Sequence, residues 1–310
     1  MRALDLLRLS TTSSTQRARP AGAPGGSLVR RARGALTTAA TTVRTDVPRR
    51  LDERTTEAAL AGFLTDYVSD REEKAADGSG HALRFAARNP LSTAAAVVAV
   101  LRLPTLPARL GTGPAADVLR RTLLTRHLGG LPVASTGVAV LDVPADPAEY
   151  VVGANRQTLR RKVRAAQKKG VGWRVVDDPA ERRLLVERAN AAEQVHADTQ
   201  YRNAAPDNAD LLEHDLWLVA TDAEGEPIML SVTPVDGEWG LLRYFRTLGA
   251  SPAHSDARYL LMPALVDALA ARGVRYLTDS TPPPQLSNGL RHFQRMVGYR
   301  YARVKVTDRA

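Results

Sequence analysis

The chain has 310 residues and a formal net charge of +10, and its 44% hydrophobic and 25% charged residues are typical of a soluble globular protein. It has no cysteine, which excludes disulfides, thiol nucleophiles, iron–sulfur clusters and cysteine-based zinc sites. No apolar run reaches the roughly 18 residues that a transmembrane helix needs, so we expect no integral membrane segment.

Residues 1–50 hold most of the excess charge, with ten arginines and two aspartates. This segment is rich in Ala, Thr, Gly and Pro and shows no apolar periodicity, so it is predicted to be a disordered basic tail. It lacks the apolar stretch of a secretory signal, and we therefore expect a cytoplasmic protein. The other 260 residues hold 33 basic and 31 acidic groups, a balance that does not indicate a generic nucleic-acid binder.

Residues 51–133 are predicted to form a helical N-terminal region. Apolar side chains recur with a 3.6-residue period, which predicts a helix over residues 51–69. Two further helices are expected at 92–103, ended by prolines, and at 115–128, ended by a pair of glycines. No motif in this region indicates a chemistry.

A strand is expected at residues 136–143, followed by a short helix or turn at 146–154 and a helix at 155–170. Asn155 is the expected N-cap of that helix, and Gly170 is its expected C-cap. The helix carries seven cations and no acid, which is unusual because solvated helices normally mix charge signs. The seven cations are Arg156, Arg160, Arg161, Lys162, Arg164, Lys168 and Lys169.

The rest of the chain alternates between strands and helices. Strands are expected at 172–176, 215–221, 227–235, 239–248, 274–279 and 299–306. Helices are expected at 179–197, 207–213, 256–272 and 287–297, the first of them with Leu184, Leu185, Ala189 and Ala192 toward the core. Helix-linked strands at both ends and a three-strand meander between them predict an α/β fold (α+β, mixed sheet). Residues 134–310 are expected to form this domain.

The order of these elements is similar to the acyltransferase fold of the GNAT superfamily. Two local sequences narrow the resemblance: the basic segment GVAVLDVPADPAEYVVGANRQTLRRKVRAAQKKGV and the closing segment ALAARGVRYLTDSTPPPQLSNGLRHFQRMVGY. Both resemble Fem-type aminoacyltransferases and their CelD/BioF2-like relatives, over residues 134–307. The resemblance implies a GNAT-like domain with an N-terminal helical extension, and N-acyltransferase activity on an amine acceptor such as a peptide, a cell-wall precursor or a small molecule.

One departure from the superfamily bears on the acyl donor. Acyl-CoA-dependent members carry a Gly-rich loop whose backbone N–H groups hold a pyrophosphate, whereas residues 251–261 contain no glycine. Fem-type enzymes also lack this loop and use aminoacyl-tRNA. We therefore expect aminoacyl-tRNA as co-substrate, with tRNA as partner and no permanently bound cofactor. An acyl-CoA or carrier-bound donor, and a non-catalytic binding module on the same fold, remain the alternatives.

The candidate catalytic residues follow from the ends and faces of the strands. Asp279 ends its strand, where it would hold or deprotonate an amine, or else cap a turn. Tyr244 and Arg243 point to opposite faces of the strand at 239–248, so only one is expected to face the gap between the central parallel strands. Arg246 shares the face of Tyr244. His292 is the third candidate, although a surface histidine would fit its position equally.

The candidate binding residues are mostly cations. Arg160, Arg161, Arg164 and Lys168 of the basic helix are expected to contact tRNA phosphates or the acceptor substrate. Arg258 lies near a helix N-terminus, where a cation is unfavourable unless an anion binds there. Relatives often place Lys at the position of Gln294 to meet substrate phosphates, and Arg295 or Arg291 would replace its charge. The segment at 196–201 lines the acceptor side or simply ends a helix. Six scattered histidines predict no metal site.

Overall fold

The computed structural model describes residues 53–74, 79–127, 130–197, 199, 202–249 and 252–309. The tail predicted over residues 1–50 lies outside these ranges. The helices are α2 (Glu53–Glu73), α3 (Ser79–Arg88), α4 (Pro90–Arg102), α5 (Pro114–Leu124), α6 (Val133–Thr136), α7 (Gln157–Lys168), α8 (Pro179–Gln194), α9 (Pro252–Ala270) and α10 (Asn288–Val297). Short 3₁₀ turns cover Pro147–Val151, Ala154–Arg156, Ala209–Glu213 and Pro283–Gln285. Among the described helices, none is long and apolar enough to cross a membrane.

The strands form a six-stranded mixed sheet, a four-stranded antiparallel sheet and a two-stranded hairpin. The first has the order β1-β12-β4-β11-β9-β8, the second β10-β7-β6-β5, and the hairpin joins β2 and β3. Their bounds are β1 (Thr105–Leu110), β2 (Arg126–His127), β3 (Leu131–Pro132), β4 (Val138–Asp142), β5 (Gly172–Val175), β6 (Leu216–Thr221), β7 (Pro227–Thr233), β8 (Val235–Asp236), β9 (Trp239–Leu242), β10 (Tyr244–Thr247), β11 (Tyr276–Asp279) and β12 (Arg300–Asp308). The predicted α/β class with a mixed sheet and an N-terminal helical extension is confirmed.

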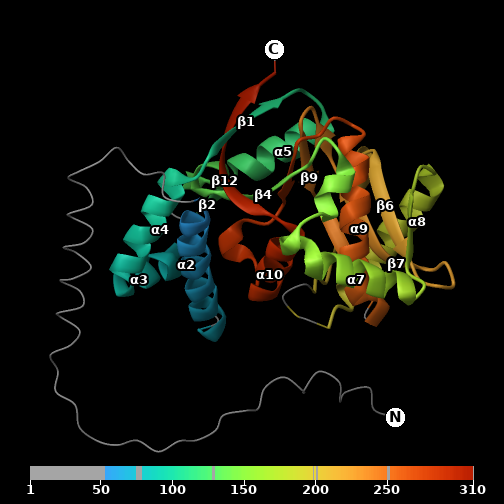
Figure 1. Ribbon diagram of the computed structural model, residues 1–310, viewed down its shortest axis with the longest axis horizontal. Coiled ribbons are helices and arrows are strands. Elements are labelled where there is room, and N and C mark those ends of the chain that lie inside the picture. Colours follow the sequence, from blue (N-terminus) through green and yellow to red (C-terminus); the bar gives the residue numbers. More distant parts are fainter. Residues whose placement is uncertain are drawn as a thin grey trace, which may run out of the picture. The chain divides into compact units, whose positions relative to one another are not determined.

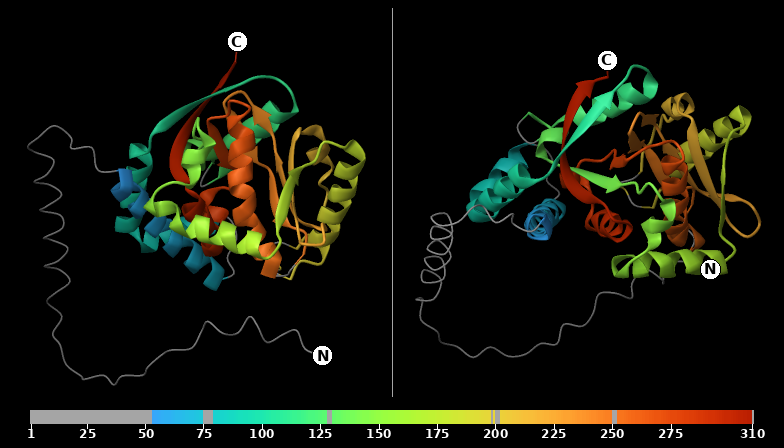
Figure 2. Two further views of the ribbon diagram at one scale, coloured as in Figure 1. Left: turned by 45° about the vertical axis from the view of Figure 1, so that its right-hand side comes forward. Right: turned by 45° about the horizontal axis from the view of Figure 1, so that its top comes forward.

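Helices cover both faces of the four-stranded sheet (Figure 1). Successive residues of β6 alternate between the faces, as a pleated strand requires. Leu218 and Ala220 join the core that contains α9, whereas Trp217 and Val219 join the core that contains α8. In turn, α7 packs against α9, and α5 covers part of the six-stranded sheet. This layering holds α9 between the basic helix α7 and the sheet (Figure 2).

The N-terminal helices α2, α3 and α4 pack on one another beside the six-stranded sheet, at the opposite end from α8 (Figures 1 and 2). Leu60 and Leu64 of α2 contact Ala99 and Leu103 at the end of α4. The predicted all-helical character of residues 51–133 requires a correction, because this range also contains β1, which pairs in parallel with β12. Its burial alternates strictly between exposed and buried residues, and its proline is tolerated because β1 is an edge strand.

Three local predictions are also corrected. Asn155 lies in a 3₁₀ turn and does not cap α7, which begins at Gln157. Leu184 is 58% exposed and does not face the core. The helix predicted from residue 256 begins four residues earlier, at Pro252, because proline suits the first turn of a helix. Gly170 follows α7 with a φ of +76°, as a helix-ending glycine does.

The strand predicted over residues 239–248 is divided at Arg243 into β9 and β10. β9 pairs in parallel with β11, and the last pair is Leu242 with Asp279. β10 leaves this partner and pairs with β7 in the other sheet. The two sheets therefore diverge directly beyond Leu242 and Asp279, as the GNAT resemblance implied for its central parallel strands.

Candidate functional site

A cleft of about 340 Å³ opens where β10 and β11 diverge. Its lining comes from the end of α8, from β10, from the second turn of α9, from the end of β11 and from α10. Six of the residues predicted for the site line this one cleft, although they are spread over more than fifty positions of the chain. They are Arg243, Tyr244, Arg246, Arg258, Asp279 and Gln294. His196 lines it as well.

Asp279 is the carboxylate at the strand end. Its Oδ1 accepts a hydrogen bond from the Thr281 backbone N–H at 2.8 Å, and its Oδ2 accepts one from Gln294 Nε2 at 2.8 Å. Burial raises the pKa of Asp279 above its ordinary value, and the hydrogen bonds from Thr281 and Gln294 offset this only in part. Asp279 therefore caps the turn at Thr281 and also lines the cleft, two roles that the sequence left as alternatives. Its raised pKa makes it a stronger base than an ordinary aspartate.

Arg243 and Tyr244 both line the cleft, which corrects the expectation that only one of them would. The reason is the break in the strand: the Arg243 N–H bonds to the carbonyl of Leu241 at 2.8 Å, so the regular alternation of faces stops there. The Arg243 guanidinium forms a two-pronged ion pair with Asp210, with N–O distances of 2.9 and 3.0 Å. This pairing fixes the arginine at the cleft wall.

A buried acid accompanies Tyr244. Glu193 at the end of α8 lines the cleft, pairs with Arg246 at 3.2 Å and accepts a hydrogen bond from Asn208 at 3.3 Å. Burial raises the pKa of Tyr244, and the nearby Glu193 carboxylate raises it further. The phenol therefore keeps its proton at neutral pH, and it can donate a hydrogen bond to a group in the cleft.

Arg258 is the cation in the cleft that has no carboxylate partner among the described residues. Its guanidinium lies 5.8 Å from the centre of the Phe293 ring, which also lines the cleft. An arginine held against an aromatic face keeps its N–H groups available for an anion. An anion bound by Arg258, as expected from the sequence, would therefore lie in the cleft.

The cations of α7 fall into two groups, and the cleft lining includes none of them. Lys162 and Lys169 pair with the buried Asp256 of α9 at 3.3 and 2.5 Å. Arg160 donates to the carbonyls of Val151 and Gly153. By contrast, three exposed cations have no carboxylate partner within the described ranges and share one stripe of the helix at i, i+3 and i+7. They are Arg161, Arg164 and Lys168.

An aromatic layer connects the basic helix with the cleft. Lys162 lies 5.6 Å from the ring centre of Tyr259, and Tyr259 packs edge-on against Phe293 with ring centres 5.3 Å apart. Phe293 in turn contacts Arg258. The basic face of α7 and the cleft are thus separated by one layer of side chains.

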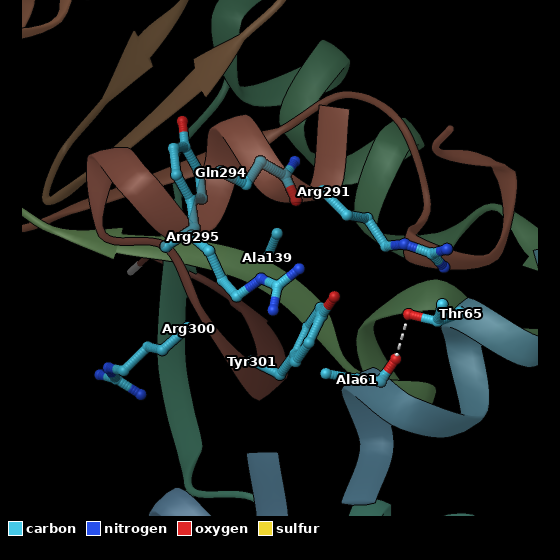
Figure 3. A pocket seen from close by; sticks show the side chains of 9 residues that line it. Ala61, Thr65, Ala139, Arg291, Gln294, Arg295, Arg300 and Tyr301 are labelled. Carbon is cyan, nitrogen blue, oxygen red and sulfur yellow. Dashed lines mark hydrogen bonds between the residues drawn. The ribbon is translucent and has the colours of Figure 1, made fainter. Parts of the chain in front are cut away.

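Three predicted residues lie elsewhere. His292 is exposed on α10 and does not line the cleft. Arg295 lines a crevice of about 30 Å³, the size of one water molecule. Figure 3 shows Arg291 and Arg295 leaving α10 in different directions, and Arg291 donates to the Leu64 carbonyl of α2. Neither arginine reaches the cleft, so neither replaces a lysine there. Gln294 lines the cleft and donates a hydrogen bond to Asp279.

Three acidic residues of this region were missed from the sequence. Glu193 had a detectable signal, because it follows Val186 and Ala189 on the core-facing stripe of α8, where an acid is out of place. Asp210 and Asp256 had none, since their partners lie on other elements. The segment at 252–258 is helical and has no glycine, so it offers no Gly-rich phosphate loop.

The sequence matches no known family profile, and no curated protein matches it significantly. Among solved structures, the chain is similar to L-PGS from Bacillus licheniformis, with 17% identity and a TM-score of 0.40. It is also similar to the C-terminal domain of an Agrobacterium fabrum protein assigned as a lysylphosphatidylglycerol synthetase, with 15% identity and a TM-score of 0.38. Each alignment covers 53% of this chain, which spans 57% and 58% of those chains. Likeness at this level carries no argument about activity.

Proposed function

We propose that the protein is an N-acyltransferase of the Fem/GNAT-like type that transfers an aminoacyl group from aminoacyl-tRNA to an amine acceptor. The observation that carries the proposal is the cleft between β10 and β11. It is lined by Asp279, which has a raised pKa, and by Arg258, which has no carboxylate partner within the described ranges. A base and an anion-binding group within one cleft are what amide formation from a polyanionic donor requires.

In this proposal the amine nitrogen attacks the acyl carbonyl, and the ester bond to the tRNA ribose breaks. The proton that the amine loses passes to Asp279. The ribose oxygen leaves as a hydroxyl with the proton that Asp279 took up, and the protonated phenol of Tyr244 would donate a hydrogen bond to the departing oxygen. Arg258 would hold a phosphate of the donor, and Gln294 would orient Asp279 through its hydrogen bond.

Aminoacyl-tRNA is preferred as donor because of α7. Three exposed cations without carboxylate partners in the described chain form a stripe along the helix, and a stripe of this kind suits a nucleic-acid backbone. The glycine-free, helical segment at 252–258 argues against the usual pyrophosphate loop of acyl-CoA enzymes.

The donor is tested by incubating the protein with charged tRNA or with acyl-CoA thioesters, and with a panel of amines, while amide products are followed by mass spectrometry. We expect turnover with charged tRNA that prior ribonuclease treatment abolishes. Turnover with a thioester that ribonuclease leaves intact would assign a CoA or carrier donor. Absence of turnover with every donor would favour a binding module.

The α7 stripe gives a sharper test. Replacing Arg161, Arg164 and Lys168 by Gln should weaken apparent tRNA affinity roughly tenfold or more near 0.1 M salt. The slope of log affinity against log salt should fall by about 1 for each phosphate that the helix no longer neutralises. The matched control replaces Arg109, Arg121 and Lys305 by Gln, which removes the same charge from exposed positions on other elements. Equal reductions of affinity in both variants would exclude a specific tRNA interaction on α7.

A further inference from the structure

A second cavity, of about 620 Å³, lies in the N-terminal helical region. Side chains of α2, α3 and α4 form most of its wall, and the segment at 131–137 and Pro283–Pro284 complete it. The wall is almost entirely apolar, and the aromatic rings of Phe63 and Tyr67 belong to it. A concave apolar site of this size with few polar groups is the usual form of a small-molecule pocket.

The mouth of this cavity is apolar as well. Four of its lining side chains are large, hydrophobic and more than half exposed: Leu83 at 73%, Val97 at 54%, Leu101 at 63% and Leu131 at 54%. Single exposed apolar residues need no explanation, but a cluster around a cavity marks a place where an apolar partner is buried. The cavity is therefore open to a ligand from solvent.

One charged residue, Arg303 of β12, lines the cavity within the described chain. Its Nε is buried without a hydrogen-bond partner among the described residues, and it has no carboxylate partner there. The Thr93 hydroxyl, also in the wall, is buried and unpartnered in the same way. Arg303 lines the cavity and has no carboxylate partner among the described residues, so its guanidinium favours a ligand with an anionic group.

The length of the α4 wall indicates how long the apolar part of the ligand is. The Arg303 guanidinium reaches the carbonyl of Leu103, so this cation lies at the C-terminal end of α4. From Leu103 back to Thr93, α4 provides a wall of about 15 Å, at 1.5 Å of helix per residue. A long alkyl chain fits such a wall, with an anionic head at one end.

From these observations we infer that the cavity binds a long-chain fatty acid, with its carboxylate at Arg303 and its alkyl chain along α2 and α4. The inference does not depend on the proposed acyl transfer, because no residue of the argument lines the cleft at Asp279. The two sites do share a loop: Asp279 and Thr281 line the cleft, whereas Pro283 and Pro284 line the cavity.

The test uses the full-length chain and radiolabelled palmitate at concentrations below micelle formation. We expect saturable binding of one palmitate per chain. Each buried methylene tightens binding about fourfold, so octanoate, whose chain is much shorter than the wall, should bind at least tenfold more weakly. Binding that does not saturate, or octanoate that binds as tightly as palmitate, would overturn the inference.

Two pairs of variants locate the ligand. Val97→Asp places a charge at the mouth and should abolish binding, whereas Val98→Asp, on the next residue and 44% exposed, does not touch the cavity and should not. Arg303→Gln should weaken palmitate about tenfold, and Lys305→Gln, which removes an exposed charge from the same strand, should have little effect.

Thermal melting of each variant confirms that it is folded. If Val98→Asp weakened binding as much as Val97→Asp, the cavity would not be the site. A cationic amphiphile of equal chain length, hexadecyltrimethylammonium, should bind much more weakly than palmitate. Equal binding of the two would show that Arg303 does not select the head group, and would overturn the assignment.

Discussion

The cleft at the diverging strands and the interface between α7 and α9 each enclose one aspartate, and the two differ in their partners. Asp279 in the cleft accepts hydrogen bonds from a backbone N–H and an amide, both neutral. Asp256 in the interface is 5% exposed and pairs with two lysines of the basic helix. Asp279 is half-buried in the cleft wall, so the two carboxyls also differ in exposure.

The pKa values of the two carboxyls shift in opposite directions. Burial raises the pKa of Asp279, and its neutral donors do not compensate. Burial also acts to raise the pKa of Asp256, but the hydrogen bonds and charges of Lys169 and Lys162 outweigh it, so the net shift is downward. The comparison shows that counter-charges decide whether a buried acid is a stable structural anion or a reactive base.

The largest expected effect is on catalysis at the uncompensated acid. Asp279→Asn keeps the size of the side chain and an acceptor for the Thr281 N–H, and Gln294 can rotate its amide to meet the new donor. The variant removes the base, so turnover should fall by about 10²–10⁴-fold, the usual contribution of a positioned acid–base group. Steady-state kinetics with the donor identified for the wild type measure this change.

A matched control separates loss of the base from a general effect of losing one negative charge. Asp267 is exposed on α9, outside the cleft, and Asp267→Asn should leave turnover within about twofold of the wild type. Asp279→Asn protein that melts normally and turns over normally would remove this residue from the mechanism.

Much of the fold could be predicted from the sequence because periodicity is a local signal. The order of strands and helices after residue 134, and the division into basic helix and meander, follow from it. The edge strand β1 could not, since the prolines at positions 104 and 107 conceal an alternating pattern. The break at Arg243 was also hidden, because residues 241–248 contain no glycine or proline to mark it.

A site residue could be predicted where counting along its own strand or helix is enough to place it at the cleft. Asp279 and Tyr244 were found in this way, because strand ends and faces can be counted. The partners of the cations were not, since Asp256 meets Lys162 and Asp210 meets Arg243 across long sequence separations. The sequence pattern alone cannot tell which of the seven cations in and beside α7 are neutralised by another element.

A smaller effect is expected on stability at the compensated acid. Asp256→Asn leaves Lys162 and Lys169 without their shared counter-charge, although both lysines are partly exposed and partly screened. The free energy of unfolding should fall by about 1–2 kcal/mol, between the values for an exposed ion pair and a buried charged hydrogen bond. This lowers the melting temperature at pH 7 by a few degrees. An unchanged melting temperature would show that water stabilises the two lysine ammonium groups as well as the Asp256 carboxylate does.

The smallest effect, and the sharpest form of the comparison, is the pH dependence of stability. A carboxyl with a lowered folded-state pKa, such as Asp256, contributes stability above the unfolded value of about 4 and loses it as the pH falls through the folded value. A carboxyl with a raised folded-state pKa, such as Asp279, contributes stability below about 4 and loses it as the pH rises through the folded value.

At pH 7, Asp279→Asn should therefore melt at or slightly above the wild type, while Asp256→Asn melts below it. The difference for Asp279→Asn should shrink toward zero as the pH falls toward 4, because a carboxyl with a raised pKa is protonated first. The difference for Asp256→Asn should shrink only as the pH falls further, below about 4, through the lowered folded-state pKa. Melting curves of the three proteins between pH 3 and pH 8 measure this. Differences of the same sign at pH 7 would show that the two aspartates do not have opposite electrostatic environments.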